Sequence, residues 1–542
     1  MAVTGNRRAV VSVQSRECSP ELLERLSGST LFPERPVGAT IVAVVCRGGG
    51  TLLYVTAPRM VDADRQVEYF LGLLPEDRAE DRAEDRAEDR AEDRAEDRAE
   101  DRAEDRAEDR AEDRAEDRAE DRADGSPPRR ERVVIGSLDD SSPRWLSDKL
   151  LDPTNAEATR LRAAVRDFVT TERQAGAEVE LSYFEPSRHL QDYATALGLP
   201  GDQADADHIP LGTKSAGRAM FRTIGIDVPA GTPLCHDVGA LAEAVADLVL
   251  AGHRRLVLKL SSTAYGAGMG NATLDLTDVT GTDRAGVVRA VAERLPGSHL
   301  VDGKLSWAEF AALIARAGIV AEEFVEADEL RSPSFQGRVT RGGDVECVST
   351  HDQVLGGVGL TYVGSSFPAD AAYRATVVEY GLRVGRYLVE RGVTTGDYGV
   401  DFIAARRGDA FQVLGCELNL RATGTRHGFV MASQLLDTLP DVDGRLFTDA
   451  PEGRSERVYQ ASDAITDPTL VGMTPGRLID AVERSPLRYD HVRRTGTVLH
   501  MLSALPRYGK FGAVCIGRDA VEAAELMRRT RDLALDAAAR PA

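Results

Sequence analysis

The sequence has few cysteines, and they lie far apart along the chain. Its 542 residues include six, at positions 18, 46, 235, 347, 416 and 515, without a Cys-x-x-Cys pair or the spacing of metal ligands. A run of about 18 apolar residues is also missing, and the first residues lack the long apolar segment of a signal peptide. We therefore expect a cytoplasmic protein with reduced cysteines and no membrane contact.

Positive charge is the second property that the sequence has little of. The formal net charge is −21, and much of it comes from twelve consecutive copies of Glu-Asp-Arg-Ala at residues 76–123. Each copy carries a net charge of −1, so the repeat accounts for −12 and the rest of the chain for −9. Because this leaves no broad basic surface for phosphate backbones, we expect no nucleic-acid partner.

The repeat also lacks large apolar side chains that could pack against a core. In a helix, its period of four would place Glu over Glu and Asp over Asp at i,i+4, which is unfavourable. We therefore expect a disordered or weakly helical insertion in a surface loop. A folded charged helix, or an arm that tethers or binds a partner, is the alternative.

Strand and helix patterns alternate on both sides of the repeat. The apolar runs within residues 38–56 predict two strands around three consecutive glycines, and residues 131–140 predict another strand. Two helical patterns and a further strand follow, up to about residue 186. Such alternation predicts a parallel sheet, so we expect residues 1–205 to form an α/β domain that the repeat interrupts. The chain after it has a mixed α+β pattern.

A glycine-rich stretch follows the strand-like run that ends near Lys259. A dinucleotide-binding loop would open a helix with G-x-G-x-x-G spacing, but the residues after Gly270 resemble another strand. A glycine hairpin between two strands can instead fold over a triphosphate, because its N–H groups are not obstructed by side chains. Lys259 would add a positive charge there, although a solvated lysine is the simpler alternative.

An acid and an amide lie two residues apart in "VLGCELNLRATGTRHG", residues 413–428. On a strand, Glu417 and Asn419 point to the same face, and Arg421 joins them if the strand continues. Residues 398–420 show a hairpin pattern with its turn at residues 407–409. A solvent-facing pair on an edge strand is the alternative, and His351 and His427 are weaker candidates for a catalytic base.

Five stretches, taken in order, resemble the ATP-grasp superfamily of ligases over about residues 212–440. They are "GTKSAGRAMFRTIGIDVPAG", "LVLKLSSTAYGAGMGNA", "VAEEFVEADE", "GVDF" and "CELNLRATGT". Further stretches, "SPRWLSDKLLD", "SPSFQGRV", "STHDQVLGG" and "HMLSALPRYGKFGAVCIG", look like the peptide ligases related to that of pheganomycin biosynthesis. The resemblance implies an α/β plus α+β fold: a leading α/β domain at 1–205, a two-part ATP-grasp domain at 206–450 and a small C-terminal domain at 451–542.

The resemblance also implies roles for individual residues. The residues expected to bind ATP are Lys214, Lys259, Gly266, Gly268, Gly270, Glu322, Glu323, Phe324, Val325 and Glu329. The lysines would contact phosphates, residues 322–325 would meet adenine through backbone groups, and Glu329 would reach the ribose. Asp401, Glu417 and Asn419 are expected to bind Mg²⁺, which prefers oxygen ligands.

Arg421 is expected to stabilise the acyl phosphate and the tetrahedral intermediate. D-alanine–D-alanine ligases have an arginine two residues before the hairpin aspartate, where this chain has Gly399. Arg421 would replace it.

These roles predict an ATP-dependent carboxylate–amine ligase that acts through an acyl phosphate and releases ADP and phosphate. Its substrates would be a small carboxylate and an amino acid or peptide amine. A non-catalytic nucleotide-binding scaffold and an ATP-grasp kinase are the alternatives. The joint presence of the two lysines and the expected metal ligands favours an enzyme, because a scaffold needs no metal site. The sequence specifies neither the acid, the amine nor the oligomeric state.

Overall fold

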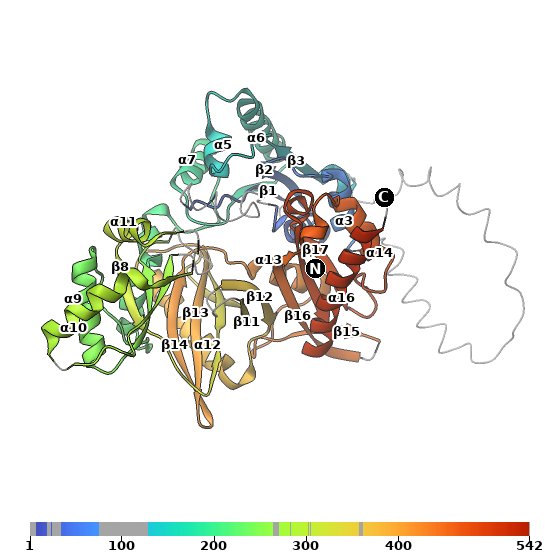
Figure 1. Cartoon of the computed structure of the whole chain (residues 1–542). Helices are drawn as coiled ribbons and strands as arrows, with labels where there is room; N and C mark the ends of the chain where they lie inside the picture. The colour runs from blue at the N-terminus through green and yellow to red at the C-terminus, as the bar shows by residue number, and fades with distance from the viewer. Residues whose placement is uncertain are drawn as a thin grey trace, which may run out of the picture.

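Three β-sheets organise the part of the chain that the structure describes (Figure 1). The computed structural model describes residues 7–18, 23, 34–74, 128–263, 270–281, 283–301, 303, 305–356, 361–451 and 453–540. The Glu-Asp-Arg-Ala repeat at 76–123 and the candidate ATP-binding residues Gly266 and Gly268 lie outside these residues.

The leading sheet has four parallel strands in the order β3-β2-β1-β4. The strands are β1 (Arg8–Val13), β2 (Thr51–Thr56), β3 (Val133–Ser137) and β4 (Glu178–Ser182). The helices of this part are α3 (Ala63–Leu71), η3 (Arg129–Arg132), α5 (Leu146–Leu151), α6 (Ala156–Gln174) and α7 (Arg188–Leu197). Every residue of β2 is buried, as expected for a central parallel strand with both faces covered. The predicted parallel α/β arrangement is confirmed.

One strand prediction in this part is wrong. The first apolar run of residues 38–56 forms a helix, α2 (Val37–Ile41), which continues as the π-helical segment η1 (Val42–Arg47). Its side chains are buried in one core cluster with Phe70 and Leu435. Only the second run forms a strand, β2.

A smaller antiparallel sheet has the order β7-β6-β5-β8. It contains β5 (Arg255–Leu260), β6 (Asn271–Asp275), β7 (His299–Leu300) and β8 (Ile319–Glu323). Nearby are η4 (Ala206–Gly212), α8 (Lys214–Thr223), α9 (Val238–Leu250), α10 (Arg284–Arg294), η5 (Leu295–Gly297) and α11 (Trp307–Ala317). The buried faces of α9 and α11 share one apolar core with β5 and β6.

The third sheet has ten strands and joins the predicted hairpin to the C-terminal part of the chain. Its strands are β9 (Glu329–Arg331), β10 (Pro333–Val339), β11 (Val345–Gly356), β12 (Thr361–Phe367), β13 (Gly396–Arg407), β14 (Ala410–Asn419), β15 (Leu446–Ala450), β16 (Gly453–Thr466), β17 (Gly496–His500) and β18 (Lys510–Gly517). Its helices are α12 (Ala371–Glu390), α13 (Arg426–Leu436), η6 (Pro468–Leu470), α14 (Pro475–Glu483), η7 (Leu502–Ala504), α15 (Leu505–Tyr508) and α16 (Ala520–Ala539). The predicted class, a parallel α/β part followed by an α+β body, is confirmed.

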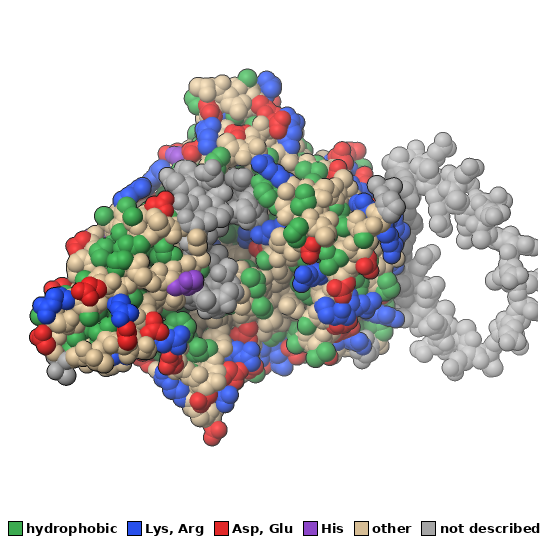
Figure 2. Space-filling view, viewed as in Figure 1, with side chains coloured by type: hydrophobic (Ala, Val, Ile, Leu, Met, Phe, Trp, Pro, Cys, Tyr) green, Lys and Arg blue, Asp and Glu red, His purple; other side chains and the backbone are tan. Residues whose placement is uncertain are grey.

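The surface carries both signs of charge. On the face shown in Figure 2, Lys and Arg side chains intermingle with Asp and Glu over the described residues. None of the helices within those residues combines the length and the apolar character that crossing a membrane requires.

Candidate active site

The β13–β14 hairpin brings Asp401 and Glu417 together. Its turn pairs Arg407 with Ala410, as predicted, and Gly408 supplies the positive φ of +65° that the turn needs. The register then shifts by one residue between Asp401 and Phe402, so that Asp401 pairs with Glu417 instead of Cys416. This bulge places two carboxylates side by side.

A chain of hydrogen bonds links Asp401 to Arg421. Asn419 Nδ2 donates to Asp401 Oδ2 at 3.0 Å, and Arg421 Nη2 donates to Asn419 Oδ1 at 2.8 Å. Gln353 Nε2 donates to the other oxygen of Asp401 at 2.6 Å. The structure therefore brings together all three expected metal ligands and the expected catalytic arginine.

The two carboxylates differ in pKa. Burial and the neighbouring charge of Glu417 raise the pKa of Asp401 to about 6. Burial acts in the same direction on Glu417, but the positive charges of Lys214, Arg421 and Lys259 together outweigh it and lower the pKa of Glu417. Lys214 is the first residue of α8 and forms an ion pair with Glu417. The expected phosphate lysine thus lies beside the expected metal ligands.

Lys259 belongs to a buried charge cluster. Its Nζ lies 2.6 Å from Glu322 Oε2, and Arg218 Nη1 lies 2.7 Å from Glu322 Oε1. Lys259 Nζ also lies 3.5 Å from Cys416 Sγ on β14. Burial would lower the pKa of Lys259, but the charges of Cys416 and Glu322 raise it overall. This ammonium group therefore stays charged at the junction of β5, β8 and β14.

The segment expected to meet adenine, residues 322–325, spans the end of β8. The N–H groups of Glu323 and Phe324 donate to the carbonyls of Ala230 and Arg255, both at 2.8 Å. Val325 is buried, and no partner for its N–H is found within the described part of the chain.

Glu329 lies farther along, on β9. Its carboxylate lies 2.6 Å from Arg331 Nη2 and 3.0 Å from Arg406 Nε, and hydrogen bonds from Arg331 and Arg406 lower its pKa. Gly270, with φ +83°, ends the glycine-rich stretch at the start of β6.

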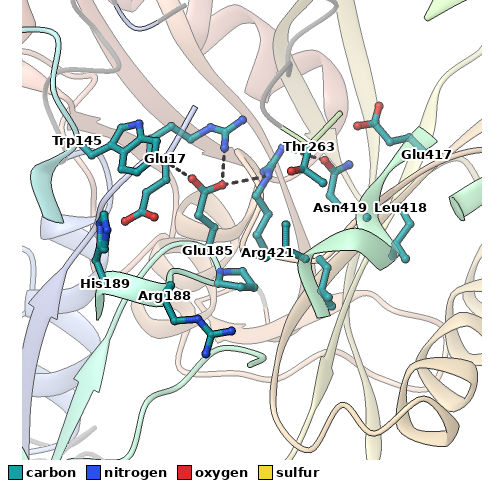
Figure 3. Close-up of a pocket in the computed structure, with 15 residues that line it drawn as sticks. Glu17, Trp145, Glu185, Arg188, His189, Thr263, Glu417, Leu418, Asn419 and Arg421 are labelled. Carbon is teal, nitrogen blue, oxygen red and sulfur yellow. Dashed lines mark hydrogen bonds and ion pairs between the residues drawn. The ribbon is translucent and has the colours of Figure 1, made fainter. Parts of the chain in front are cut away.

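A cavity of about 260 Å³ lies next to the hairpin (Figure 3). The residues that line it are Arg16, Glu17, Trp145, Glu185, Pro186, Arg188, His189, Ile209, Gly212, Thr263, Glu417, Leu418, Asn419, Leu420 and Arg421. The first seven come from the leading α/β part, and the sequence analysis missed them. One signal could have pointed to part of this set, because Glu185 lies at the carboxyl end of the predicted strand that ends near residue 186, and ligands usually bind at that edge of a parallel sheet.

The two histidines considered as bases do not line this cavity. His351 is buried against Tyr459, and burial lowers its pKa to about 3. His427 is buried against the His500 ring, with ring centroids 4.5 Å apart. Both have the surroundings of core histidines.

Comparison with known proteins gave three kinds of match. The chain is 31% identical to the L-propargylglycine–L-glutamate ligase of Streptantibioticus cattleyicolor over 368 residues, which cover 67% of this chain and 70% of that enzyme. Residues 477–530 match the family described as PGM1 C-terminal domain.

Two solved structures are similar to the whole chain. The match to the biotin carboxylase of Campylobacter jejuni covers 98% of this chain and 95% of the carboxylase chain, with 10% identity and a TM-score of 0.49. The match to the N5-carboxyaminoimidazole ribonucleotide synthetase of Thermus thermophilus covers 97% of this chain and 98% of the synthetase chain, with 12% identity and a TM-score of 0.46.

Proposed function

The chain belongs to the ATP-grasp ligase family, and we propose that it joins a small carboxylate to an amine through an acyl phosphate, with the conversion of ATP to ADP and phosphate. The amine would be that of an amino acid or a short peptide. The single observation that carries this proposal is the cluster at the open end of the β13–β14 hairpin, opposite its turn. There, Lys214, Asp401, Glu417, Asn419 and Arg421 meet beside a cavity.

For the nucleotide, we assign the phosphates to Lys214 and Lys259 and to the glycine-rich stretch that includes Gly266, Gly268 and Gly270. Because the N–H groups of Glu323 and Phe324 already donate within the protein, the N–H of Val325 is the better candidate for adenine. Glu322 holds Lys259 in place, and Glu329 is assigned to the ribose hydroxyls.

The hairpin residues fit Mg²⁺. Asp401 and Glu417 repel each other, and a cation between them would relieve that repulsion. Within the described ranges there is no group of three or more His, Cys, Asp or Glu side chains that could hold a metal ion. Asp401, Glu417 and the Asn419 oxygen would therefore hold an ion that keeps water and phosphate ligands, as Mg²⁺ does. Such an ion offsets the negative charge of the phosphates.

Arg421 is suited to the acyl-transfer step. Carboxylates are poor electrophiles, so the acid must first be activated as an acyl phosphate before an amine attacks. Arg421 lines the cavity and is held by Asn419, and its guanidinium group can stabilise negative charge on the acyl phosphate and on the tetrahedral intermediate.

Hydroxylamine trapping tests this proposal. The enzyme is incubated with MgATP, candidate carboxylic and amino acids, and hydroxylamine in place of the amine. A ligase that forms an acyl phosphate releases ADP and forms the hydroxamate of the acid in equal amounts. ADP release without any hydroxamate would identify a kinase acting on another group, and no acid-dependent ADP release would identify a scaffold.

A further inference from the structure

The cavity lies where the chain order of the leading sheet reverses. From β1 the chain proceeds to β2 and β3 on one side, whereas β4 flanks β1 on the other. The segments that leave the carboxyl ends of β1 and β4 therefore diverge, and such a switch point forms a binding crevice in parallel sheets. Arg16 and Glu17 follow β1, and Glu185 and Pro186 follow β4. All four line the cavity.

Positive charge gathers at the middle of this crevice. Arg16 forms an ion pair with Glu185, and Arg421 Nε lies 3.9 Å from the same carboxylate oxygen (Figure 3). Two guanidinium groups thus share one carboxylate, and Arg421 Nε lies too far from it for a hydrogen bond.

A carboxylate without a cation lies next to it. Glu17 Oε1 accepts hydrogen bonds from the hydroxyl groups of Ser147 and Ser187, both at 2.5 Å. Within the described part of the chain, no donor to Glu17 Oε2 and no ion pair of Glu17 is found. The backbone N–H of Glu17 donates to the Glu185 carboxylate, which also contacts the two arginines. Glu17 therefore lies next to the Arg16–Glu185–Arg421 cluster.

The wall beyond these charges is partly aromatic. Trp145 and His189 pack together with ring centroids 5.8 Å apart, and both line the cavity on the side away from Glu417 (Figure 3). The crevice thus offers an anion site near the hairpin, a cation site beside it, and an aromatic wall behind them.

We propose that this crevice binds the acid substrate as a zwitterionic amino acid, with its carboxylate toward Arg16 and Arg421 and its ammonium group at Glu17. This inference rests on the proposed ligase function. It makes Glu17 a specificity-determining residue. An acid without an ammonium group would leave this half-buried carboxylate unpaired in the crevice, and that acid is therefore penalised.

The test uses matched pairs of acids that differ only in the ammonium group. They are alanine and propanoate, leucine and 4-methylpentanoate, phenylalanine and 3-phenylpropanoate, and glutamate and glutarate. ADP release with MgATP and hydroxylamine gives kcat/KM for each acid, and calorimetry gives the binding of the same acids to the full-length protein. In the wild-type protein, the best amino acid should exceed its partner by at least about tenfold.

The Glu17→Gln variant keeps the hydrogen-bond acceptor for the serine hydroxyls and removes the charge. It should lower kcat/KM for the amino acid by about tenfold or more and change that of the matched acid by less than about threefold, so that the discrimination disappears. Arg16→Gln should lower kcat/KM for both acids of a pair by the same factor. Asp192→Asn, at an exposed position of α7, is the matched control and should leave kcat/KM for both acids unchanged.

The inference is overturned if Glu17→Gln discriminates between the two acids of a pair as the wild type does, or if it loses kcat/KM equally for both acids. In either case, turnover by the wild-type protein still supports the ligase function. If no acid supports ADP release, the ligase function fails. The zwitterion site then survives only if calorimetry shows amino-acid binding that Glu17→Gln abolishes, and it is overturned otherwise.

Discussion

Glu417 is the residue at which the parts of the proposed site meet. It pairs with Lys214, lies opposite Asp401 across the hairpin and lines the cavity. In the proposed site its charge would therefore act on a metal ion and a lysine at once, whereas adenine would bind elsewhere, near Val325. We expect the charge of Glu417 to matter more for phosphoryl transfer than for nucleotide affinity.

Glu417→Gln should reduce the rate of ligation by at least about a hundredfold, a loss typical of removing one group that stabilises transition-state charge. The dissociation constant for ATP should rise by less than about tenfold. Steady-state ADP release and ATP calorimetry measure the two effects. Asp409→Asn, at the exposed hairpin turn, is the control. Metal-dependent turnover near the wild-type rate in Glu417→Gln would contradict its assignment as a metal ligand.

Glu34 makes the stability of the fold depend on pH. Its side chain is buried, Oε1 accepts a hydrogen bond from the Ser503 N–H at 2.9 Å, and Oε2 has no partner within the described residues. Burial raises the pKa of this carboxyl to about 7 from an ordinary 4.5. Between these values the folded chain keeps a proton that the unfolded chain releases, so stability falls as pH rises through this window.

The Glu34→Gln variant removes that titration. We expect its melting temperature, relative to that of the wild type, to rise between pH 4.5 and pH 8, with a difference in unfolding free energy of about 3 kcal/mol. Thermal melts of both proteins at pH 4.5, 6 and 8 measure it. Parallel pH profiles for the two proteins would show that Glu34 is not the titrating group.

At the scale of elements, the hairpin was predictable and its register was not. The turn residues around Gly408 indicate where β13 and β14 meet, and strand alternation places Glu417 and Asn419 on one face. The bulge beside Asp401 depends on packing from other elements, since a regular hairpin with the same turn would pair Asp401 with Cys416. No local pattern specifies that extra residue.

The incorrect strand at residues 38–47 has a similar cause. β-branched residues favour strands in isolation, but this segment is buried between α3 and α13 and forms a helix there. A helix that is apolar on all sides lacks the 3.6-residue polar pattern that would reveal it. Tertiary packing therefore decides between the two structures.

Helix α12 supports the hairpin through close contacts at glycine. A Cβ added at Gly385 would overlap the Tyr398 hydroxyl on β13 and Val345 on β11. Because a tyrosine ring cannot move out of the way easily, Gly385→Ala should lower the free energy of unfolding by about 1–3 kcal/mol. Gly297→Ala, where nothing lies within 4 Å, is the matched control. Equal melting temperatures of the two variants would contradict this account of α12.

At the scale of the whole molecule, the described residues that flank the repeat lie close together. Arg129 Nη1 donates to the Leu74 carbonyl at 2.8 Å, so the two ends of the segment that contains the repeat are already close together. Loop-closure entropy rises slowly with length, and 48 extra residues destabilise a loop by only about 1–2 kcal/mol.

Deletion of residues 76–123 should therefore leave ATP-dependent turnover intact and keep or slightly raise the melting temperature. The full-length and deleted proteins are compared by thermal melts and by ADP release. A clear drop in either quantity would show that the repeat has a structural role.

The cavity is the part of the site that the sequence could least predict. Arg16, Glu185 and Arg421 are separated by more than 160 residues at each step, and only the packing of the leading sheet against the hairpin brings them together. The residues near Glu417 were predictable because one hairpin carries most of them. Short-range patterns and the family resemblance therefore indicated the proposed phosphate and metal end of the site, whereas long-range packing creates the proposed substrate end.

The central claim is that this protein forms an amide bond at the expense of ATP. The most direct measurement is a coupled ADP-release assay with amino acids and short peptides offered in pairs, with mass spectrometry of the products. The account predicts ADP release that requires both an acid and an amine, together with one equivalent of a product whose mass equals that of the two substrates minus water. ADP release that does not depend on the amine, or that gives no condensed product, would contradict it.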